Sequence, residues 1–428
     1  PPELIIQDEL HLISGPLGTM VGLYETAIDY LAGRDVGGKR IGPKVVASTA
    51  TIRRAREQIQ SLFARRLAIF PSPGLEAGNS FFSEEQPLES VPGRSYVGIF
   101  APGRSIKTAL VRVYAALLAA TEAMGADPED LDPYRTLVGY FNSLRELGGA
   151  VRLIEDDVKA RIKVLARRTK GQVYPYKTRT IRENVPELTS RVDSSEIPSI
   201  LQRLEQPFHA KDEKIAPVDV VLASNMISVG VDVGRLGLMV VTGQPKTTAE
   251  YIQATSRVGR THPGLVFTVY NWARPRDVSH YERFESYHDA LYRYVEAISV
   301  TPFSSRARDR ALSAALVMMS RLYIPGLAKK EEAQNFKPSH PLVALVKDQV
   351  KQRVESIEPA KTKEVIDDLQ NLIDRWQKKT MGKSLVYSNA TKKPNLMFAL
   401  GENPKGAEFG VPNSMRDVEK SIGIYLKE

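Results

Sequence analysis

Short apolar runs alternate with helical patterns along residues 1–280, and this alternation restricts the possible folds more than any other feature. Residues 3–7 and 44–51 predict two strands, and predicted helices follow them over 20–32 and 52–66. Further elements are a helix at 108–124 and strands at 96–101, 137–141, 218–223, 238–241 and 266–270. Because strand–helix–strand units normally build parallel sheets, the pattern predicts an α/β fold.

The predicted elements divide the 428 residues into four segments, in keeping with the two or three domains expected for this length. Residues 1–70 and 131–280 predict two α/β domains. We interpret residues 71–130 as an intervening segment, because its first part is rich in Pro, Gly, Ser and Glu. Residues 281–428 predict a helical C-terminal region, with helices at 288–299, 307–322 and 342–379 and a closing strand at 422–426.

Composition narrows the classes of function. The chain has 59 Lys and Arg against 50 Asp and Glu, a net charge of +9 that favours a polyanionic partner without identifying it. It contains no cysteine, which excludes disulfides, Cys-ligated metals and thiol catalysis. The six histidines lack metal-ligand spacing. No apolar run reaches membrane-spanning length, so we expect a soluble protein with no membrane partner.

An acidic pair, Asp8 and Glu9, follows the first predicted strand directly. One carboxylate of such a pair can hold Mg²⁺ while the next orients and deprotonates an attacking water. Acidic pairs are also common in ordinary solvated loops, and the pair alone does not separate the two interpretations.

A second polar group comprises Gln253, Arg257 and Arg260. Spacings of three and four residues place them on one face if this segment is helical, so that three donors could converge on one anion. Arginines aimed at a γ-phosphate stabilise charge in the transition state. The alternative is a solvated basic helix.

Five segments together resemble the motifs of superfamily-two helicases, and they occur in the order found in that superfamily. Asp8-Glu9-Leu10-His11 resembles the DEAH-type Walker B box, and residues 48–51 resemble the coupling motif. Residues 141–143, 223–232 and 253–260 are similar to the motif opening the second lobe and to motifs V and VI. The resemblance implies two RecA-like parallel-sheet lobes, the first incomplete, with a helical C-terminal addition.

A narrower resemblance is to the DrmA family, the helicase subunits of DISARM anti-phage defence. It is carried by residues 225–232, 243–253, 270–277 and 412–419. It implies a cytoplasmic bacterial helicase or translocase that uses ATP and Mg²⁺, acts on DNA that is or includes a single strand, and binds a DrmB-type protein. Two alternatives stay open: a non-hydrolysing DNA-binding scaffold and an RNA helicase.

The resemblance also implies roles for individual residues. Asp8 would hold Mg²⁺, Glu9 would be the base for water, and His11 would link the nucleotide site to the second lobe. Gln253, Arg257 and Arg260 would surround the γ-phosphate, with Gly230 and Asp232 along the nucleotide cleft. Nucleic-acid contacts or coupling would come from Thr49, Thr51, Asn142, Ser224 and Asn225. Ala254 departs from the pattern, because many of these helicases have Arg there.

Aromatic residues near motif VI add one hypothesis that rests on the residues alone. Tyr270 and Trp272, followed by Arg274 and Arg276, could stack a base and hold phosphates. The alternative is domain packing.

A helicase also needs a glycine-rich phosphate loop before the acidic box, and only seven residues precede Asp8. We therefore expect that loop upstream of Pro1 and expect this piece to be inactive alone. Residues 98–105 and 381–384 are similar to parts of the phosphate-loop pattern. Both follow the acidic box, and neither has the complete pattern.

Overall fold

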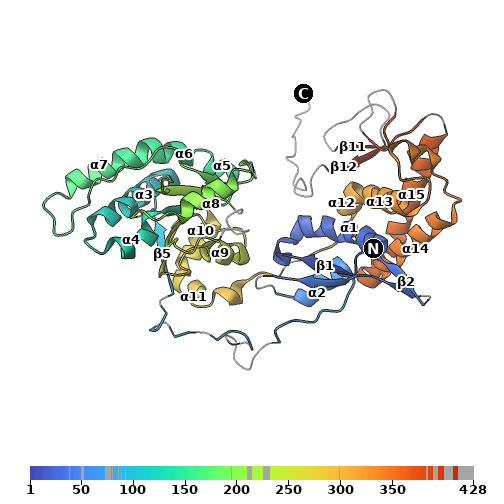
Figure 1. Cartoon of the computed structure of the whole chain (residues 1–428), viewed down its shortest axis with the longest axis horizontal. Coiled ribbons are helices and arrows are strands. Elements are labelled where there is room, and N and C mark those ends of the chain that lie inside the picture. Colours follow the sequence, from blue (N-terminus) through green and yellow to red (C-terminus); the bar gives the residue numbers. More distant parts are fainter. Residues whose placement is uncertain are drawn as a thin grey trace. The chain divides into compact units, whose positions relative to one another are not determined.

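The computed structural model describes two compact units, formed by Pro1–Phe70 with Ala297–Glu428 and by Pro71–Glu296 (Figure 1). The description covers the chain apart from residues 38, 50–52, 73–78, 80, 85, 88, 92, 194, 210–214, 225–231, 298, 382–383, 389–393, 400–407 and 413–428. The predicted strand at 422–426 lies outside the described residues. Among the described helices, none is long and apolar enough to cross a membrane.

The unit formed by Pro71–Glu296 contains a six-stranded sheet in the order β5-β10-β9-β6-β8-β7, and every pair of neighbouring strands is parallel. The strands are β5 (Arg94–Phe100), β6 (Leu137–Phe141), β7 (Glu187–Leu188), β8 (Val220–Ala223), β9 (Leu238–Thr242) and β10 (Gly264–Tyr270). Every residue of β6, β8 and β9 is buried, which explains their uninterrupted apolar runs. The predicted α/β fold is confirmed.

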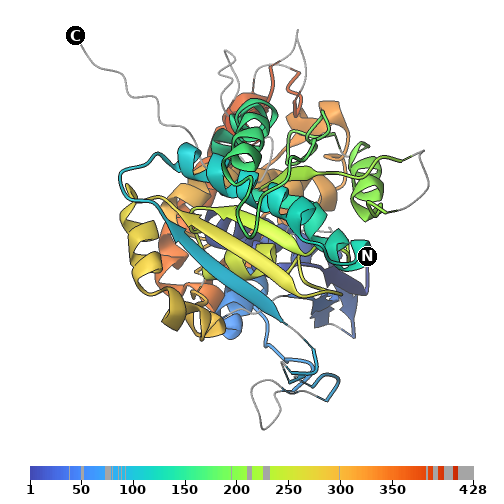
Figure 2. The ribbon, with the colours of Figure 1, turned by 90° about the vertical axis from the view of Figure 1, so that its left-hand side faces the viewer.

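Helices cover both faces of this sheet, because successive side chains of a strand point to opposite faces. Leu137 packs with α3 (Ile106–Ala123), the π-helix η2 (Leu153–Val158) and α7 (Lys159–Arg168). Val138 packs on the other face with α8 (Ile197–Glu205), α9 (Thr248–Thr255) and α11 (Phe284–His288). Figure 2 shows the sheet with α3 along one face. The remaining helical elements are α4 (Pro128–Arg135), α5 (Leu144–Leu147), α6 (Ala150–Arg152), α10 (Pro275–Glu282) and η4 (Leu291–Tyr294).

Two predictions for this unit are wrong. Residues 71–130 are not wholly an intervening segment, because β5 pairs with β10 along its full length and α3 covers the sheet. The partner of β5 begins at Gly264, and a pairing so distant in the sequence has no local signal. The predicted helix over 288–299 is also wrong for the described residues of that range: α11 ends at His288, and the short 3-10 helix η4 follows.

The other unit begins with two parallel strands, β1 (Leu4–Gln7) and β4 (Lys44–Ala47). The connection between them contains the 3-10 turn η1 (Leu10–Leu12), helix α1 (Gly15–Ala32) and the hairpin of β2 (Arg34–Val36) and β3 (Lys39–Ile41). Helix α2 (Ala55–Phe63) follows β4, so the predicted strand–helix alternation is present here as well.

The C-terminal helices share one hydrophobic core with α1. Met20, Leu23 and Ala27 of α1 pack with residues of α13 (Ser313–Tyr323), α14 (Pro341–Ile357) and α15 (Thr362–Thr380). Trp376 of α15 is fully buried, and its ring stacks on Phe336 with centroids 4.0 Å apart. The predicted helix at 342–379 is divided in two by the turn η7 (Pro359–Lys361). The other elements are α12 (Ser305–Ala307), η5 (Arg308–Leu312), η6 (Lys330–Asn335), β11 (Met397–Ala399) and β12 (Phe409–Val411).

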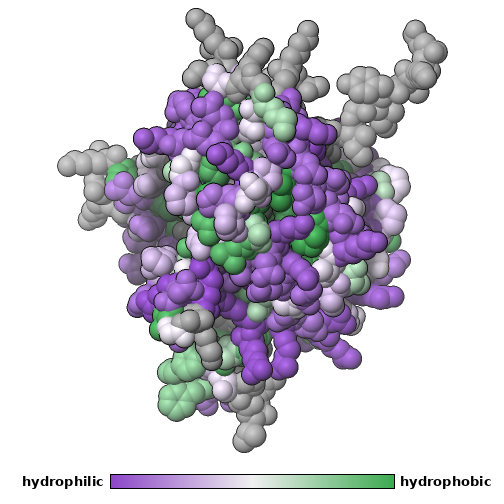
Figure 3. Space-filling view, turned by 90° about the vertical axis from the view of Figure 1, so that its right-hand side faces the viewer, coloured by the Kyte–Doolittle hydropathy of each residue, from purple (hydrophilic) through white to green (hydrophobic). Residues whose placement is uncertain are grey.

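The face of the molecule shown in Figure 3 is mainly hydrophilic, with hydrophobic side chains in interrupted patches. This distribution agrees with the core composition, because several large apolar side chains of α13 and α15, among them Leu316 and Trp376, are buried within the unit. Residues 297–428 contribute helices α12 to α15 and complete the core of the segment that carries Asp8 and Glu9.

A partly buried charge cluster joins α1 to α14. Asp29 of α1 forms ion pairs with Arg65 and with Arg353 of α14, and the Arg353 Nη2 atom donates to the carbonyl of Leu62 at 2.8 Å. Glu25 lies one helical turn before Asp29. Burial raises the pKa of Glu25 from its ordinary value of 4.5 to about 7, and the nearby Arg353 only partly opposes this shift.

Replacing Glu25 with Gln should make the stability of this unit less dependent on pH. The folded state binds the Glu25 proton more tightly than the unfolded chain, so the free energy of unfolding falls as pH rises from 4.5 to about 7. We expect Glu25→Gln to be more stable than the natural chain at pH 8 by about 1–3 kcal/mol, and equally stable near pH 4. Urea unfolding at both pH values checks this, with the exposed Glu355→Gln as control. Equal stabilities at pH 8 would contradict it.

Candidate functional site

The acidic pair lies where β1 and β4 end beside each other. The Asp8 carboxylate accepts hydrogen bonds from the Ser48 hydroxyl and, at 2.9 Å, from the Glu9 N–H group. Backbone bonds join the same two segments, from Ser48 N to Gln7 O at 3.0 Å and from Leu10 N to Ser48 O at 2.9 Å. The structure thus brings the two predicted motifs, the acidic box and the hydroxyl-rich segment at 48–51, into direct contact.

These hydrogen bonds keep Asp8 ionised. The Ser48 hydroxyl, followed by the Glu9 N–H group, lowers the pKa of Asp8, because both donate to the charged form. No group of three or more His, Asp or Glu side chains suited to a metal occurs among the described residues. Mg²⁺ keeps several waters and often uses only one or two protein carboxylates, so an ionised Asp8 beside a hydroxyl oxygen fits this ion.

Glu9 adopts a left-handed backbone conformation with φ 52° and ψ 45°. A side chain in this region costs about 1–3 kcal/mol, and such residues cluster at functional sites. Its carboxylate lies 3.4 Å from Nε2 of His11, which is buried, while Glu9 itself is partly exposed. The Gln58 amide of α2 fixes the turn by donating to the Ile13 carbonyl at 2.8 Å. Glu9 and His11, both predicted nucleotide-site residues, are therefore neighbours.

The predicted arginines occupy a turn after α9, and the prediction of one helical face is wrong. Gln253 lies on α9, which ends at Thr255, so Arg257 and Arg260 follow the helix. The guanidinium of Arg260 forms an ion pair with Asp232, which joins two of the predicted nucleotide-site residues. The side chain of Ala254 is fully buried in the core, so Arg at this position would not face a ligand.

Gly259 explains why the helix does not continue to Arg260. Its φ is +72°, and its N–H group donates to the Leu236 carbonyl at 2.8 Å. A Cβ atom at this position would lie 2.6 Å from the Gly264 Cα atom, closer than such atoms can approach. The turn that presents Arg260 therefore requires glycine.

Gly259→Ala should destabilise the sheet unit by at least about 3 kcal/mol, because the left-handed backbone and the backbone clash both act against alanine. Gly103 is a matched control: its φ is also +72°, but a Cβ atom there would meet no other atom within 4 Å. We expect Gly103→Ala to cost about 1 kcal/mol. Urea unfolding of both variants measures the difference. If both variants lose the same free energy of unfolding, the backbone has relaxed to relieve the clash at residue 259.

The carboxyl ends of β6, β9 and β10 carry a second group of predicted residues. Asn142 follows β6, and its Nδ2 atom donates to the Thr242 carbonyl at 2.9 Å. Its buried Oδ1 atom has no hydrogen-bond partner among the described residues. Trp272 is 45% exposed and donates through Nε1 to the Arg104 carbonyl at 2.7 Å. Arg274 forms an ion pair with Glu146. We call this surface, defined by Asn142, Trp272 and Arg274, the carboxyl edge.

Other predicted residues are placed differently. Tyr270 is buried against Tyr281 and Phe284, which favours packing over base stacking. Ser224, directly after β8, is also buried, while Thr49 is exposed after β4. Thr51, Asn225 and Gly230 lie outside the described residues.

The sequence reasoning missed Asp277, which organises the carboxyl edge. Its carboxylate accepts hydrogen bonds from the N–H groups of Asn271, at 2.8 Å, and Gln244, at 3.2 Å. It therefore ties the loop after β10 to the loop after β9. Burial raises the pKa of Asp277, and the two N–H donors oppose that shift. In the sequence Asp277 is simply an acidic residue two positions after Pro275, at the start of α10, and this pattern does not predict that it binds the backbone of two loops.

Comparison with known proteins places this sheet in a family. Residues 154–262 match the helicase conserved C-terminal domain. The chain is 47% identical to the DISARM protein DrmA of Bacillus paralicheniformis in an alignment of 441 residues. That alignment covers 100% of this chain and 38% of DrmA, so the chain spans well under half the length of this relative.

Solved helicase structures also resemble the chain. The DUF1998 helicase MrfA bound to DNA and AMPPNP has a TM-score of 0.48 and 19% identity, covering 75% of this chain and 37% of that one. The Mycobacterium smegmatis helicase Lhr bound to ssDNA and AMP-PNP has a TM-score of 0.48 and 12% identity, covering 85% and 38%.

The family match falls on β7, β8, β9 and α9, the part of the parallel sheet that leads to the turn of Arg257 and Arg260. The chain therefore contains a helicase C-terminal domain. Along its entire length it is related to the DISARM protein DrmA.

Proposed function

We propose that this chain is part of an ATP-dependent DNA helicase or translocase of a bacterial DISARM-like defence system. The observation that carries the proposal is the contact of Asp8 with Ser48 and Glu9 at the ends of β1 and β4. An ionised carboxylate beside a second carboxylate is the arrangement that nucleotide hydrolysis needs. The relation to the DISARM protein DrmA supports the defence setting.

The residues have distinct tasks in this mechanism. Asp8 would hold Mg²⁺ through its ionised carboxylate, and bound Mg²⁺ would neutralise charge on the phosphates of ATP. Glu9 orients the attacking water and takes its proton, while buried His11 fixes the direction of the Glu9 carboxylate. On the sheet unit, Gln253, Arg257, Arg260 and Asp232 are proposed to bind the phosphates of ATP.

Nucleic acid is proposed to bind at the carboxyl edge. The Asn142 Oδ1 atom is buried without a partner among the described residues, and Trp272 presents a half-exposed ring on which a base can stack. The net charge of +9 suits a polyanion. Thr49 and Thr51 follow the strand whose end contacts Asp8, a position suited to coupling hydrolysis to nucleic-acid binding. A DrmB-type protein is the proposed partner.

DNA-stimulated ATP hydrolysis by the product of the whole gene tests the proposal. We expect single-stranded DNA to raise turnover by at least about tenfold, since closure on DNA would assemble the hydrolytic residues. Bound DNA without ATP turnover would favour a non-hydrolysing scaffold. Stimulation by RNA and not by DNA would identify an RNA helicase.

A further inference from the structure

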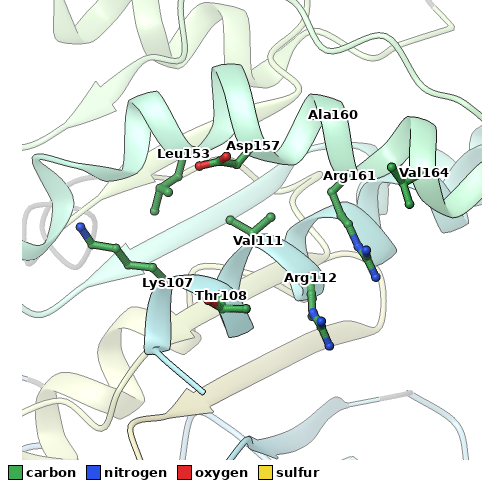
Figure 4. Close-up of a pocket in the computed structure, with 9 residues that line it drawn as sticks. All are labelled: Lys107, Thr108, Val111, Arg112, Leu153, Asp157, Ala160, Arg161 and Val164. Carbon is green, nitrogen blue, oxygen red and sulfur yellow. The ribbon is translucent and has the colours of Figure 1, made fainter. Parts of the chain in front are cut away.

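A groove of about 430 Å³ runs between α3 and the helical segment formed by η2 and α7 (Figure 4). Its charged lining residues are Lys107 and Arg112 of α3, Asp157 of η2 and Arg161 of α7. Val111 and Val164 provide apolar lining. We call this surface the α3–α7 groove. It belongs to neither the acidic pair nor the turn after α9.

The cations of the groove lack the ion pairs that other arginines of the unit make. Arg179 and Arg235 pair with Asp219 and Asp132, at 2.6 and 2.8 Å. Within the described part of the chain, Lys107, Arg112 and Arg161 form no ion pair. Such a set of like charges around one groove with a single carboxylate attracts an anion.

The Arg161 side chain gives a more specific indication. Its Nε atom is buried, and among the described residues it has no hydrogen-bond acceptor. A buried donor without an acceptor costs about 1–3 kcal/mol, which an anionic ligand would recover. In Figure 4, Arg161 and Arg112 extend from facing helices toward the same end of the groove, while Lys107 lies at the other end. An extended ligand with repeated negative charges suits this arrangement better than one small anion.

The loop that leads into α3 connects the first turn of the groove to the carboxyl edge. The Trp272 indole donates at 2.7 Å to the carbonyl of Arg104, in the loop that leads into α3. Ser105 caps α3 by accepting the Thr108 N–H bond at 3.2 Å, and Lys107 lies in this first helical turn. A strand held at Trp272 therefore meets Lys107 first and then Arg112 and Arg161.

We infer that the α3–α7 groove binds the sugar–phosphate backbone of a nucleic-acid strand and extends the contact that begins at the carboxyl edge. The inference rests on the nucleic-acid binding in the proposed function. Phosphates lie opposite the guanidinium groups of Arg112 and Arg161 and the ammonium group of Lys107. These side chains contact phosphates and not base edges, so we expect binding in the groove to be independent of base sequence, because phosphate contacts carry no sequence information.

The double substitution Arg112→Gln and Arg161→Gln tests the inference. Binding of fluorescein-labelled oligothymidylate to the chain is measured by anisotropy, without nucleotide, over a range of salt concentrations. We expect a loss of at least about tenfold in affinity and a decrease of about one in the salt slope, since each single-strand phosphate contact contributes about 0.7. The control is Lys163→Gln with Arg168→Gln, which removes two exposed cations of α7 outside the groove. It should change affinity less than about threefold.

The outcomes separate the inference from the proposed function. If the natural chain binds DNA and the groove variant binds it equally well, the inference is wrong and the function stands. If the natural chain binds no DNA, both fail. If the groove variant loses binding to polyglutamate but binds oligothymidylate as tightly as the natural chain does, the groove is a site for an acidic protein and the inference is overturned.

A second measurement avoids any effect of lost charge on folding. The chain has no cysteine, so Ala160→Cys introduces a single thiol in the groove. Saturating oligothymidylate should slow modification of that thiol by at least about fivefold, because a bound strand covers it. An unchanged rate of modification at saturation would overturn the inference.

Discussion

Replacing Glu9 with Gln should lower ATP turnover by at least about a hundredfold while ATP binding is retained, because a positioned general base contributes about 10²–10⁴ to the rate. The amide keeps the size of the side chain and its place beside His11, where the carboxylate now lies 3.4 Å from Nε2. It cannot accept a proton from water. The effect should therefore appear in kcat and not in nucleotide affinity.

The measurement is steady-state ATP hydrolysis by the whole-gene product at saturating single-stranded DNA, beside equilibrium binding of a fluorescent ATP analogue. Glu3→Gln is the matched control, since Glu3 lies just before β1 and its exposed carboxylate pairs with Arg34. The control should keep turnover within about twofold, as exposed ion pairs contribute little. Turnover by Glu9→Gln at the natural rate would remove Glu9 from the role of base.

Much of the sheet can be predicted from the sequence, because its central strands are buried on both faces. β6, β8 and β9 consist of apolar runs, and each predicted strand lies within a few residues of its observed bounds. For β5 the sequence predicts a strand but not its place in this sheet. Its pairing with β10 depends on residues far apart in the chain, and no local pattern indicates such a pairing.

The candidate site is predictable in its residues and less so in its geometry. The order of motifs identifies Asp8, and the structure places its carboxylate against Ser48 of the predicted coupling segment. The sequence wrongly predicts helix at Arg257 and Arg260, because spacing alone does not reveal that Gly259 has a φ of +72° beside Gly264. Asp277 escapes prediction for a similar reason: its hydrogen bonds go to the backbone of two other loops.

The hydrophobic core that α1 shares with the C-terminal helices cannot be predicted from the sequence either. Each C-terminal helix shows an ordinary amphipathic pattern, and such a pattern says that a face is buried without naming its partner. Met20 and Leu23 of α1 pack with Leu316 and Trp376 of the C-terminal helices, roughly 300 residues or more away in the sequence. The acidic pair therefore depends on the C-terminal region for the stability of its unit.

Replacing Arg260 with Ala should lower ATP turnover by at least about a thousandfold, the effect of removing an arginine that stabilises charge on the transferred phosphoryl group. In the structure the Arg260 guanidinium pairs with Asp232, whose side chain is 79% exposed. A pair so exposed contributes only up to about 1 kcal/mol, so Arg260 can exchange this partner for a phosphate at little cost.

The decisive comparison is between turnover and affinity. Arg260→Ala should leave ATP affinity within about threefold of the natural value, because the arginine acts mainly on charge that develops in the transition state. Arg293→Ala, which removes an exposed arginine of the same unit, is the control and should change neither quantity. Arg260→Lys should restore little, since an ammonium group lacks the planar fork that binds phosphate oxygens. If turnover and affinity fall by the same factor, Arg260 binds ATP equally in the ground and transition states and is not an arginine finger.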